Sequence, residues 1–277
     1  DGRALAVGGP QQRRLLAMLV VNRGRVVSVD RIIEAMWSEG DPPDGANRSV
    51  LTYVSRLRAG LPAGTLATID GGYRLESDRA ACDVDEFERL VTSAEAPMPD
   101  RAIELLTEAI ALWRGRAFGE FGDAYGAGVE SARLDERLAV AHEERATALL
   151  AIGHHARAVP DLEVMVRNHP IRERPAELLM QALRSAGRQA EAIRAFQRYR
   201  RHLADETGLE PSPALQALCD SMFDAHNDGA AIGRPLRGYT ILEAIGEGSF
   251  GRVYSATQPA TGRTVAIKAI RPDLADS

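Results

Sequence analysis

Apolar residues recur at helical spacing in three segments near the start of the chain, residues 11–22, 29–37 and 46–61. Steps of three and four residues place them on one face of each helix, where they would pack against a common core. The predicted core positions are Leu15, Leu16, Leu19, Val20, Ile32, Ile33, Met36, Trp37, Val50, Val54, Leu57 and Leu61, with Leu51 beside them. Pro10 before the first helix and Ser28 as cap of the second support these boundaries.

Residues 62–80 lose the helical spacing. Residues 66–69 and 73–75 alternate like short strands, and Asp70-Gly71-Gly72 between them is a turn sequence. Residues 3–7 predict one further strand ahead of the first helix. Three helices followed by a β-hairpin are the pattern of a winged helix-turn-helix, in which the third helix enters the DNA major groove and the hairpin is the wing.

The outer face of residues 46–61 carries amides, hydroxyls and arginines, and no acidic side chain. Arginine can reach guanine edges or neutralise phosphates, and short side chains allow close approach to the groove. We predict that Arg48, Thr52 and Arg56 face bases or adjacent phosphates. The secondary candidates are Asn47, Ser49, Tyr53 and Ser55. A solvated helix face is the simpler interpretation of the same pattern.

Aromatic and basic residues beside this face have alternative roles. Core packing against the second helix is an equal alternative for Tyr53, and Arg58 is expected to be a solvated surface residue. Arg74 lies on the second strand of the hairpin. It is predicted to meet a phosphate or the minor groove, as wing residues do.

The region from residue 83 to 225 is helical in pattern, with almost no sign of strands. Five of its expected helices cover residues 105–113, 134–152, 156–167, 176–186 and 190–204. Residue types recur at an offset of 34, so that Gly153 matches Gly187 and Ala158 matches Ala192. The further matches are Ala148 with Ala182, Leu149 with Leu183, and Leu162 with Phe196. This period, with glycine at the turn between helices and alanine at close crossings, is typical of tetratricopeptide repeats. Pro170 lies between two such units, where a helix must stop.

Charge separates the two regions. Residues 1–80 hold 11 arginines against 9 acidic residues, whereas residues 81–225 hold 17 arginines against 25 acidic residues. A nucleic-acid contact is therefore expected in the first region. The acidic helices could form a surface for protein partners or only a solvated scaffold.

Several strings resemble one family of regulators. Gly72-Tyr73-Arg74-Leu75 is similar to the end of the wing in OmpR-type DNA-binding domains. Residues 26–37 (VVSVDRIIEAMW) and 53–61 (YVSRLRAGL) resemble the Streptomyces antibiotic regulatory protein family of transcriptional activators. Residues 203–218 (LADETGLEPSPALQAL) resemble the bacterial transcriptional activation domain of the same family. The resemblance implies an OmpR-type winged helix over residues 1–80 and a tetratricopeptide-like activation domain over residues 83–225. It also implies double-stranded DNA, RNA polymerase or another protein as partners, and self-association as a homodimer.

This family has an antiparallel sheet before the first helix, and at most its last strand is found here, so the chain is expected to be cut at its start. His154 and His155 could begin a metal site, but no further ligands are spaced around them, and exposed turn residues are the better interpretation. Cys82 and Cys219 are far apart and are expected to be buried and reduced. No apolar run is long enough to span a bilayer and no signal peptide is found, so we expect a cytoplasmic protein.

Residues 226–238 have the composition of a linker, and a glycine-rich string follows. Gly246, Gly248, Gly251 and Val253 fit the pattern G-x-G-x-x-G-x-V. The pattern also occurs in dinucleotide-binding folds, but those need a helix after the glycines, whereas strand patterns flank it here.

Val265-Ala266-Ile267-Lys268 completes a pair of motifs that resembles the start of a eukaryotic-like Ser/Thr protein kinase. The resemblance implies that residues 239–277 are the first strands of an incomplete N-lobe, in which the glycines, Val253, Ala266 and Lys268 would bind ATP with Mg²⁺. Lys268 could be an ordinary surface lysine, but it is the only lysine among 34 basic residues. The catalytic loop and metal site of kinases are not found, so no cofactor or catalysis is expected of this chain alone, and ATP binding is expected of the full-length protein.

The sequence therefore predicts a mainly α protein with a winged helix, a tetratricopeptide-like helical array and a short incomplete β segment. The predicted function is sequence-specific activation of transcription. A signalling kinase targeted by its first 225 residues, and a tetratricopeptide adaptor with a vestigial winged helix, are the alternatives.

Overall fold

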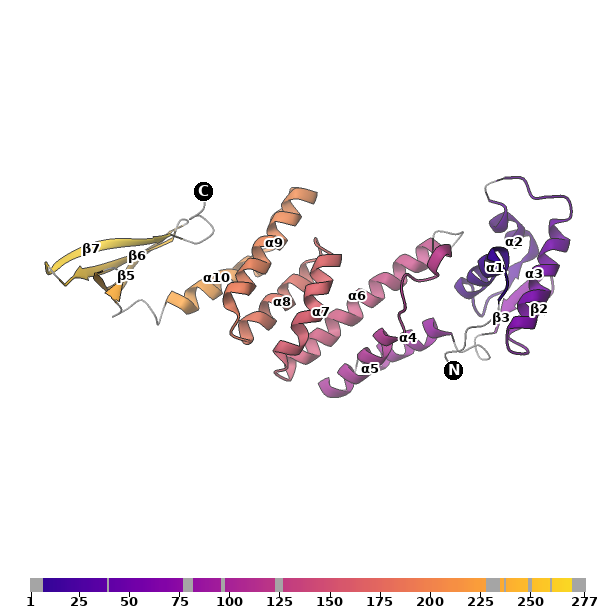
Figure 1. The fold of residues 1–277 in the computed structure, drawn as a ribbon, viewed down its shortest axis with the longest axis horizontal. Coiled ribbons are helices and arrows are strands. Elements are labelled where there is room, and N and C mark those ends of the chain that lie inside the picture. Colours follow the sequence, from indigo (N-terminus) through magenta and orange to yellow (C-terminus); the bar gives the residue numbers. More distant parts are fainter. Residues whose placement is uncertain are drawn as a thin grey trace. The chain divides into compact units, whose positions relative to one another are not determined.

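The computed structural model describes residues 7–38, 40–76, 82–95, 98–122, 127–227, 235–236, 238–248, 251–259 and 261–270. They belong to two compact units, residues 1–168 and 169–277. Helices dominate both the first unit and the start of the second, as the sequence pattern predicts (Figure 1). No described helix combines the length and apolar character needed to cross a membrane.

The first unit begins with α1 (Pro10–Val21), α2 (Val29–Met36) and α3 (Ala46–Gly60). The predicted boundaries of these helices are confirmed to within a residue or two. Pro10 lies in the first turn of α1, and the Ser28 hydroxyl accepts a hydrogen bond from the Arg31 amide at 3.2 Å. The predicted strand over residues 3–7 falls almost wholly outside the described residues.

Three short strands pack beside these helices as an antiparallel sheet in the order β1-β3-β2. The hairpin of β2 (Leu66–Ile69) and β3 (Gly72–Leu75) is confirmed. The sequence pattern missed β1 (Val27–Ser28), which pairs with β3 through Val27 and Tyr73. Two residues are too short a run for alternation to be detectable.

One hydrophobic core holds α3 in place. Val50, Val54 and Leu57 are at most 2% exposed and pack with residues of α1 and α2, as predicted. Leu61 is only partly buried against the same core. The prediction for Leu51 was wrong, because its side chain is 60% exposed. At about 100° per residue, Leu51 is turned away from the buried stripe to the outer face of the helix.

The remaining helices of the first unit are α4 (Asp83–Ser93), α5 (Pro99–Ala111), α6 (Ala127–Ala151) and α7 (His155–Asn168), with a 3₁₀ turn, η1 (Gly119–Phe121). In Figure 1, α4, α5 and α6 lie side by side. Their core includes Phe87, Leu90 and Leu106, and the Phe87 ring meets the Trp113 ring edge-on with centroids 5.6 Å apart.

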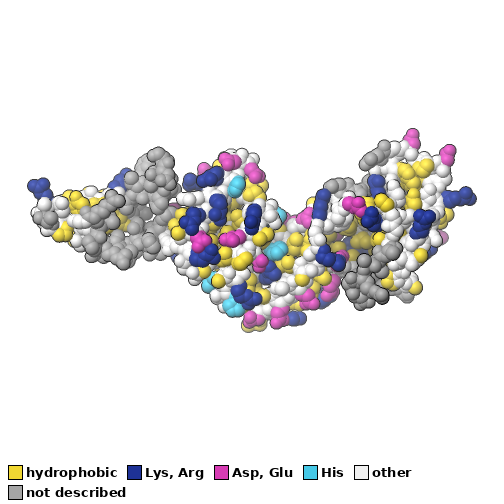
Figure 2. Space-filling model, viewed as in Figure 1, with side chains coloured by type: hydrophobic (Ala, Val, Ile, Leu, Met, Phe, Trp, Pro, Cys, Tyr) yellow, Lys and Arg dark blue, Asp and Glu magenta, His cyan; other side chains and the backbone are white. Residues whose placement is uncertain are grey.

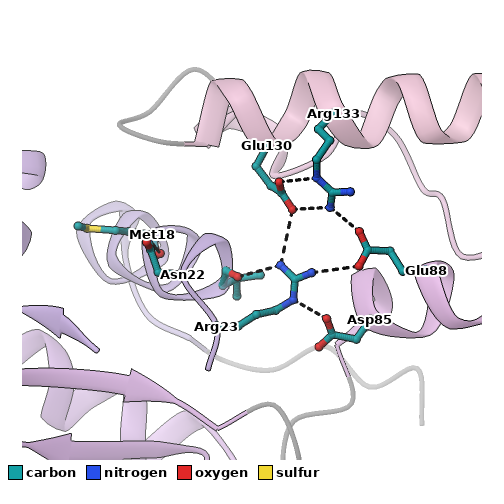
Figure 3. Close-up of polar contacts among 8 residues, drawn as sticks. Met18, Asn22, Arg23, Asp85, Glu88, Glu130 and Arg133 are labelled. Carbon is teal, nitrogen blue, oxygen red and sulfur yellow. Dashed lines mark hydrogen bonds and ion pairs between the residues drawn. The ribbon is translucent and has the colours of Figure 1, made fainter. Parts of the chain in front are cut away.

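Arg23, just after α1, joins the helices around α3 to this helical region (Figure 3). Its guanidinium forms ion pairs with Asp85, with Glu88 at 3.6 Å and with Glu130 at 3.6 Å. The Arg23 side chain is 15% exposed. Arg133 donates two hydrogen bonds to Glu130, each at 2.8 Å, and also pairs with Glu88. Because the acids lie on α4 and α6, this cluster, Arg23–Asp85–Glu88–Glu130–Arg133, connects three parts of the unit.

The second unit begins with α8 (Glu173–Ser185), α9 (Gln189–Thr207) and α10 (Pro213–Asn227). The Tyr199 hydroxyl lies 3.3 Å from a Glu173 carboxylate oxygen, which also accepts the Ser212 amide at 3.0 Å. The buried position of Tyr199 beside Glu173 raises the pKa of its hydroxyl to about 12. Pro170 falls between α7 and α8, as expected.

The repeat at 34 residues is confirmed at its turns. Gly153 and Gly187 have positive φ values of 78° and 75°. The amide after each glycine donates an equivalent hydrogen bond to the end of the preceding helix. The His154 amide donates to the Leu149 carbonyl oxygen and the Arg188 amide to the Leu183 carbonyl oxygen, each at 2.8 Å. Ala158 and Ala192 are both fully buried.

A four-stranded antiparallel sheet closes the described part of the second unit, with β4 (Pro235–Leu236), β5 (Tyr239–Gly248), β6 (Gly251–Gln258) and β7 (Arg263–Ile270). Its core is small, formed by Ile241, Tyr254 and Ala256. Leu242 and Ile245 are 46% and 55% exposed. A sheet this small has too little core to bury all of its apolar side chains.

Candidate nucleic-acid interface

The outer face of α3 is an exposed surface of polar and basic side chains. Basic side chains are visible over the part of the first unit that contains α3 (Figure 2). The exposed members of this face are Asn47, Arg48, Leu51, Thr52, Ser55 and Arg56. Ser49 and Tyr53 are half-buried at its margin. The structure thus brings the predicted residues together on one side of one helix and adds Leu51 to them.

Arg48 and Arg56 hold their charges in solvent. Among the described residues, no carboxylate lies within ion-pair distance of either guanidinium. Many arginines elsewhere are paired, as in Arg89 with Glu86 and Arg188 with Glu191. Two exposed and uncompensated guanidinium groups on an acid-free face favour binding to phosphates or guanine edges.

Neighbouring side chains on α3 have defined roles. The Thr52 hydroxyl donates to the Arg48 carbonyl oxygen at 3.0 Å, which leaves its lone pairs available to a donor. Tyr53 packs against the core of the three helices, which agrees with the core-packing alternative. Its part-exposed surface still adjoins the outer face of α3.

Arg58 fastens α3 to the hairpin. Its guanidinium donates to the Leu66 carbonyl oxygen at 3.1 Å and to the Thr68 hydroxyl at 2.6 Å. It also lies 5.9 Å from the centre of the Tyr73 ring. Arg58 is exposed, as expected, but its guanidinium forms hydrogen bonds with the protein. No sequence signal marks this role, because the partner is a backbone carbonyl.

Arg74 on β3 forms an ion pair with Glu76, through two hydrogen bonds of 3.0 and 2.7 Å to one carboxylate oxygen. Both side chains are partly buried. The pair offsets the charge that was expected to meet a phosphate. A DNA contact by Arg74 therefore requires that this pair open or be shared, and the role stays a prediction.

The glycine-rich segment spans the end of β5 and the start of β6. In the register of these strands Gly246 lies opposite Val253, and Gly248 lies opposite Gly251. Residues 249–250 are outside the described residues. Lys268 pairs with Val253 across β6 and β7, and both Lys268 and Ala266 are exposed.

The expectations for the histidine pair and for the two cysteines can also be compared with the structure. His154 is exposed at a turn and His155 begins α7, and no group of three or more metal-binding side chains occurs within the described ranges. Cys219 is buried, whereas Cys82 is only half-buried before α4, so that expectation was wrong for Cys82. Neither cysteine forms a disulfide bond within the described part of the chain.

Comparison with known proteins places both regions in one architecture. The family model described as "Transcriptional regulatory protein, C terminal" matches residues 5–75. The model described as "Bacterial transcriptional activator domain" matches residues 82–222, about half of the chain.

Named relatives share this architecture. The regulatory protein AfsR of Streptomyces coelicolor is 36% identical over 98% of this chain and 29% of its own length. The transcriptional regulatory protein MoaR1 of Mycobacterium tuberculosis is 35% identical over 87% of this chain and 81% of its own length. The chain thus spans less than a third of AfsR and most of MoaR1.

A solved structure agrees with these matches. Mycobacterium tuberculosis EmbR, solved in complex with a low-affinity phosphopeptide, superposes with a TM-score of 0.72. It is 30% identical, and the match covers 97% of this chain and 74% of that one. The chain belongs to the Streptomyces antibiotic regulatory protein family of DNA-binding transcriptional regulators.

Proposed function

We propose that the chain is a cytoplasmic, sequence-specific transcriptional activator that inserts α3 into the DNA major groove. The observation that carries the proposal is a pair of guanidinium groups, Arg48 and Arg56, on an exposed and acid-free helix face, where no carboxylate of the described residues forms an ion pair with them. Burial of Val50, Val54 and Leu57 turns this face outward and keeps it there.

Each part of the first unit has a role in this proposal. Arg48, Thr52 and Arg56 would contact base edges or the adjoining phosphates, and Asn47, Ser49 and Ser55 would contribute close polar contacts. The three helices and the sheet act as a winged helix-turn-helix, with β2 and β3 as the wing. Arg58 fixes the angle between α3 and β2, so it positions the wing rather than reading DNA.

The helices from α4 to α10 are proposed to bind proteins, either RNA polymerase or a second copy of the chain. The relative EmbR was solved with a phosphopeptide, which supports a protein partner for this family. The acidic balance of residues 81–225, with 25 acids against 17 arginines, is unfavourable for binding nucleic acid there.

Selection of binding sites from random DNA duplexes, using the 277-residue chain, tests the main proposal. We expect recovery of a defined sequence, repeated at about one helical turn, roughly 10 bp. Arg48→Ala and Arg56→Ala should reduce the affinity for the selected sequence more than the affinity for random DNA. Equal affinity for all duplexes would contradict the proposal, and pull-down of protein partners without any DNA would favour the adaptor alternative.

A second function is proposed for residues 239–277 in the full-length protein. The supporting observations are the antiparallel strands β5 and β6, which pair through Gly248 and Gly251, and the position of Lys268 on β7. In a kinase-like N-lobe the glycine turn would cover ATP phosphates with Mg²⁺, and the lysine would contact the α and β phosphates. ATP binding by the full-length protein, lost in Lys268→Met, tests this role.

A further inference from the structure

Leu51 is an exposed apolar side chain in the middle of the candidate DNA-binding face. It is 60% exposed, while Val50 next to it is fully buried. On a helix, Asn47 and Ser55 are its neighbours four residues away, and Arg48 is its neighbour three residues away. Leu51 is thus surrounded by the side chains that would approach base edges.

Packing within the chain does not explain this position. The core residues of α3 make the contacts that hold the helix, and Leu51 belongs neither to that core nor to the partly buried residues around it. A leucine in this position leaves apolar area in water, and covering that area with an apolar group of a partner would be favourable. A single leucine among polar and basic side chains also does not form the extended apolar patch of a protein interface.

We propose that Leu51 reads thymine by packing against its C5-methyl group in the major groove. The inference rests on the proposed function of α3. Among the four bases only thymine presents a methyl group in that groove, and apolar side chains are the ones that recognise it. Leu51 would therefore specify an A·T pair beside the positions read by the hydrogen-bonding residues.

Replacement of thymine by uracil, one position at a time, tests the contact at the level of one methyl group. The probe is the duplex selected by the 277-residue chain. Burial of one methyl group corresponds to about a fourfold change in affinity. Each repeat of the selected sequence should therefore contain one thymine whose replacement by uracil weakens binding roughly fourfold. Leu51→Ala, whose side chain is too short to reach the methyl group from this position, should bind the thymine and uracil duplexes equally. Leu51→Met, which keeps both the length and the apolar character, should keep a preference for thymine.

Leu209→Ala is a matched control, because Leu209 is 62% exposed and lies outside α3. It should leave the whole uracil profile unchanged. Thermal unfolding should be nearly equal for the wild type and Leu51→Ala, since Leu51 contributes little to the core. If Leu51→Ala keeps the wild-type uracil profile, the inference is overturned while the proposed function stands. If the wild type selects no sequence at all, both fail.

Discussion

The Arg58 guanidinium donates a hydrogen bond to the Leu66 carbonyl oxygen at 3.1 Å, so the candidate recognition helix is bonded to the first strand of the hairpin. A second bond to the Thr68 hydroxyl, at 2.6 Å, engages the same strand two residues later. The two elements proposed to touch DNA are therefore held as one rigid piece. Preorganisation of this kind reduces the ordering that binding would otherwise require.

Arg58→Met should loosen the hairpin while keeping the apolar stem of the side chain. We expect a loss of about 1–2 kcal/mol in the free energy of unfolding, because two hydrogen bonds from a charged donor are removed at a partly exposed site. Urea denaturation measures this loss. Arg56→Met is the matched control on the same helix and should change stability by less than about 0.5 kcal/mol, since surface substitutions without partners cost little. Equal destabilisation by both variants would contradict the role of Arg58.

Arg48→Ala and Arg56→Ala should weaken binding to the selected duplex by about 1–3 kcal/mol each if the side chains read bases. A variant that loses a base contact should also lose its preference at one position. A variant that loses only a phosphate contact should weaken all duplexes alike and reduce the slope of affinity against salt by about one. Binding measured at several salt concentrations on selected and random duplexes separates these outcomes. Unchanged affinity in both variants would remove these arginines from the interface.

Residues in regular elements could be predicted well from the sequence. The buried stripe of Val50, Val54 and Leu57 follows directly from helical spacing, and Gly153 and Gly187 follow from the period of 34. In each case a repeated physical requirement, either burial or a left-handed turn, leaves a repeated residue type.

Contacts made between elements could not be predicted in this way. One partner of Arg58 is a backbone carbonyl, and the acidic partners of Arg23 lie more than 60 residues away in the chain. Leu51 shows the limit of pattern within one helix. Helical geometry places an apolar residue at the edge of a stripe about 100° from it, and the neighbouring elements determine whether that position is covered.

Arg23→Met should weaken the junction between the α1–α3 region and the helical region. Removal of the guanidinium leaves Asp85, Glu88 and Glu130 near one another with Arg133 as the remaining cation. We expect a loss of about 1–3 kcal/mol, because partly buried acids then lack their shared partner. Arg89→Met is the control, since Arg89 forms an exposed pair with Glu86 on one helix and such pairs contribute little. If Arg23→Met lowers the free energy of unfolding no more than Arg89→Met does, packing alone holds the junction.

The pH dependence of stability should carry a contribution from Glu130. Its hydrogen bond to Arg133 holds the pKa of the Glu130 carboxyl below its usual range. A lowered pKa in the folded state stabilises the fold above the ordinary glutamate pKa of about 4.3, and this stabilisation is lost as the pH falls through the lowered value. Between pH 7 and 3, the midpoint temperature of thermal unfolding should therefore fall less steeply in Glu130→Gln than in the wild type. Parallel curves would show that Glu130 titrates as it does in the unfolded chain.

Gly153→Ala and Gly187→Ala should destabilise the chain to a similar extent, although the two residues lie 34 positions apart. Both glycines have positive φ, and open space surrounds the place that a Cβ atom would occupy at each. The cost is therefore one of backbone conformation alone, about 1–2 kcal/mol at each site. Gly128→Ala is the control, because Gly128 lies in the first turn of α6, where alanine meets only ordinary contacts and should be neutral or stabilising. A large loss at only one of the two turns would mean that the two repeats are not equivalent in energy, even though their turns have the same hydrogen bonds.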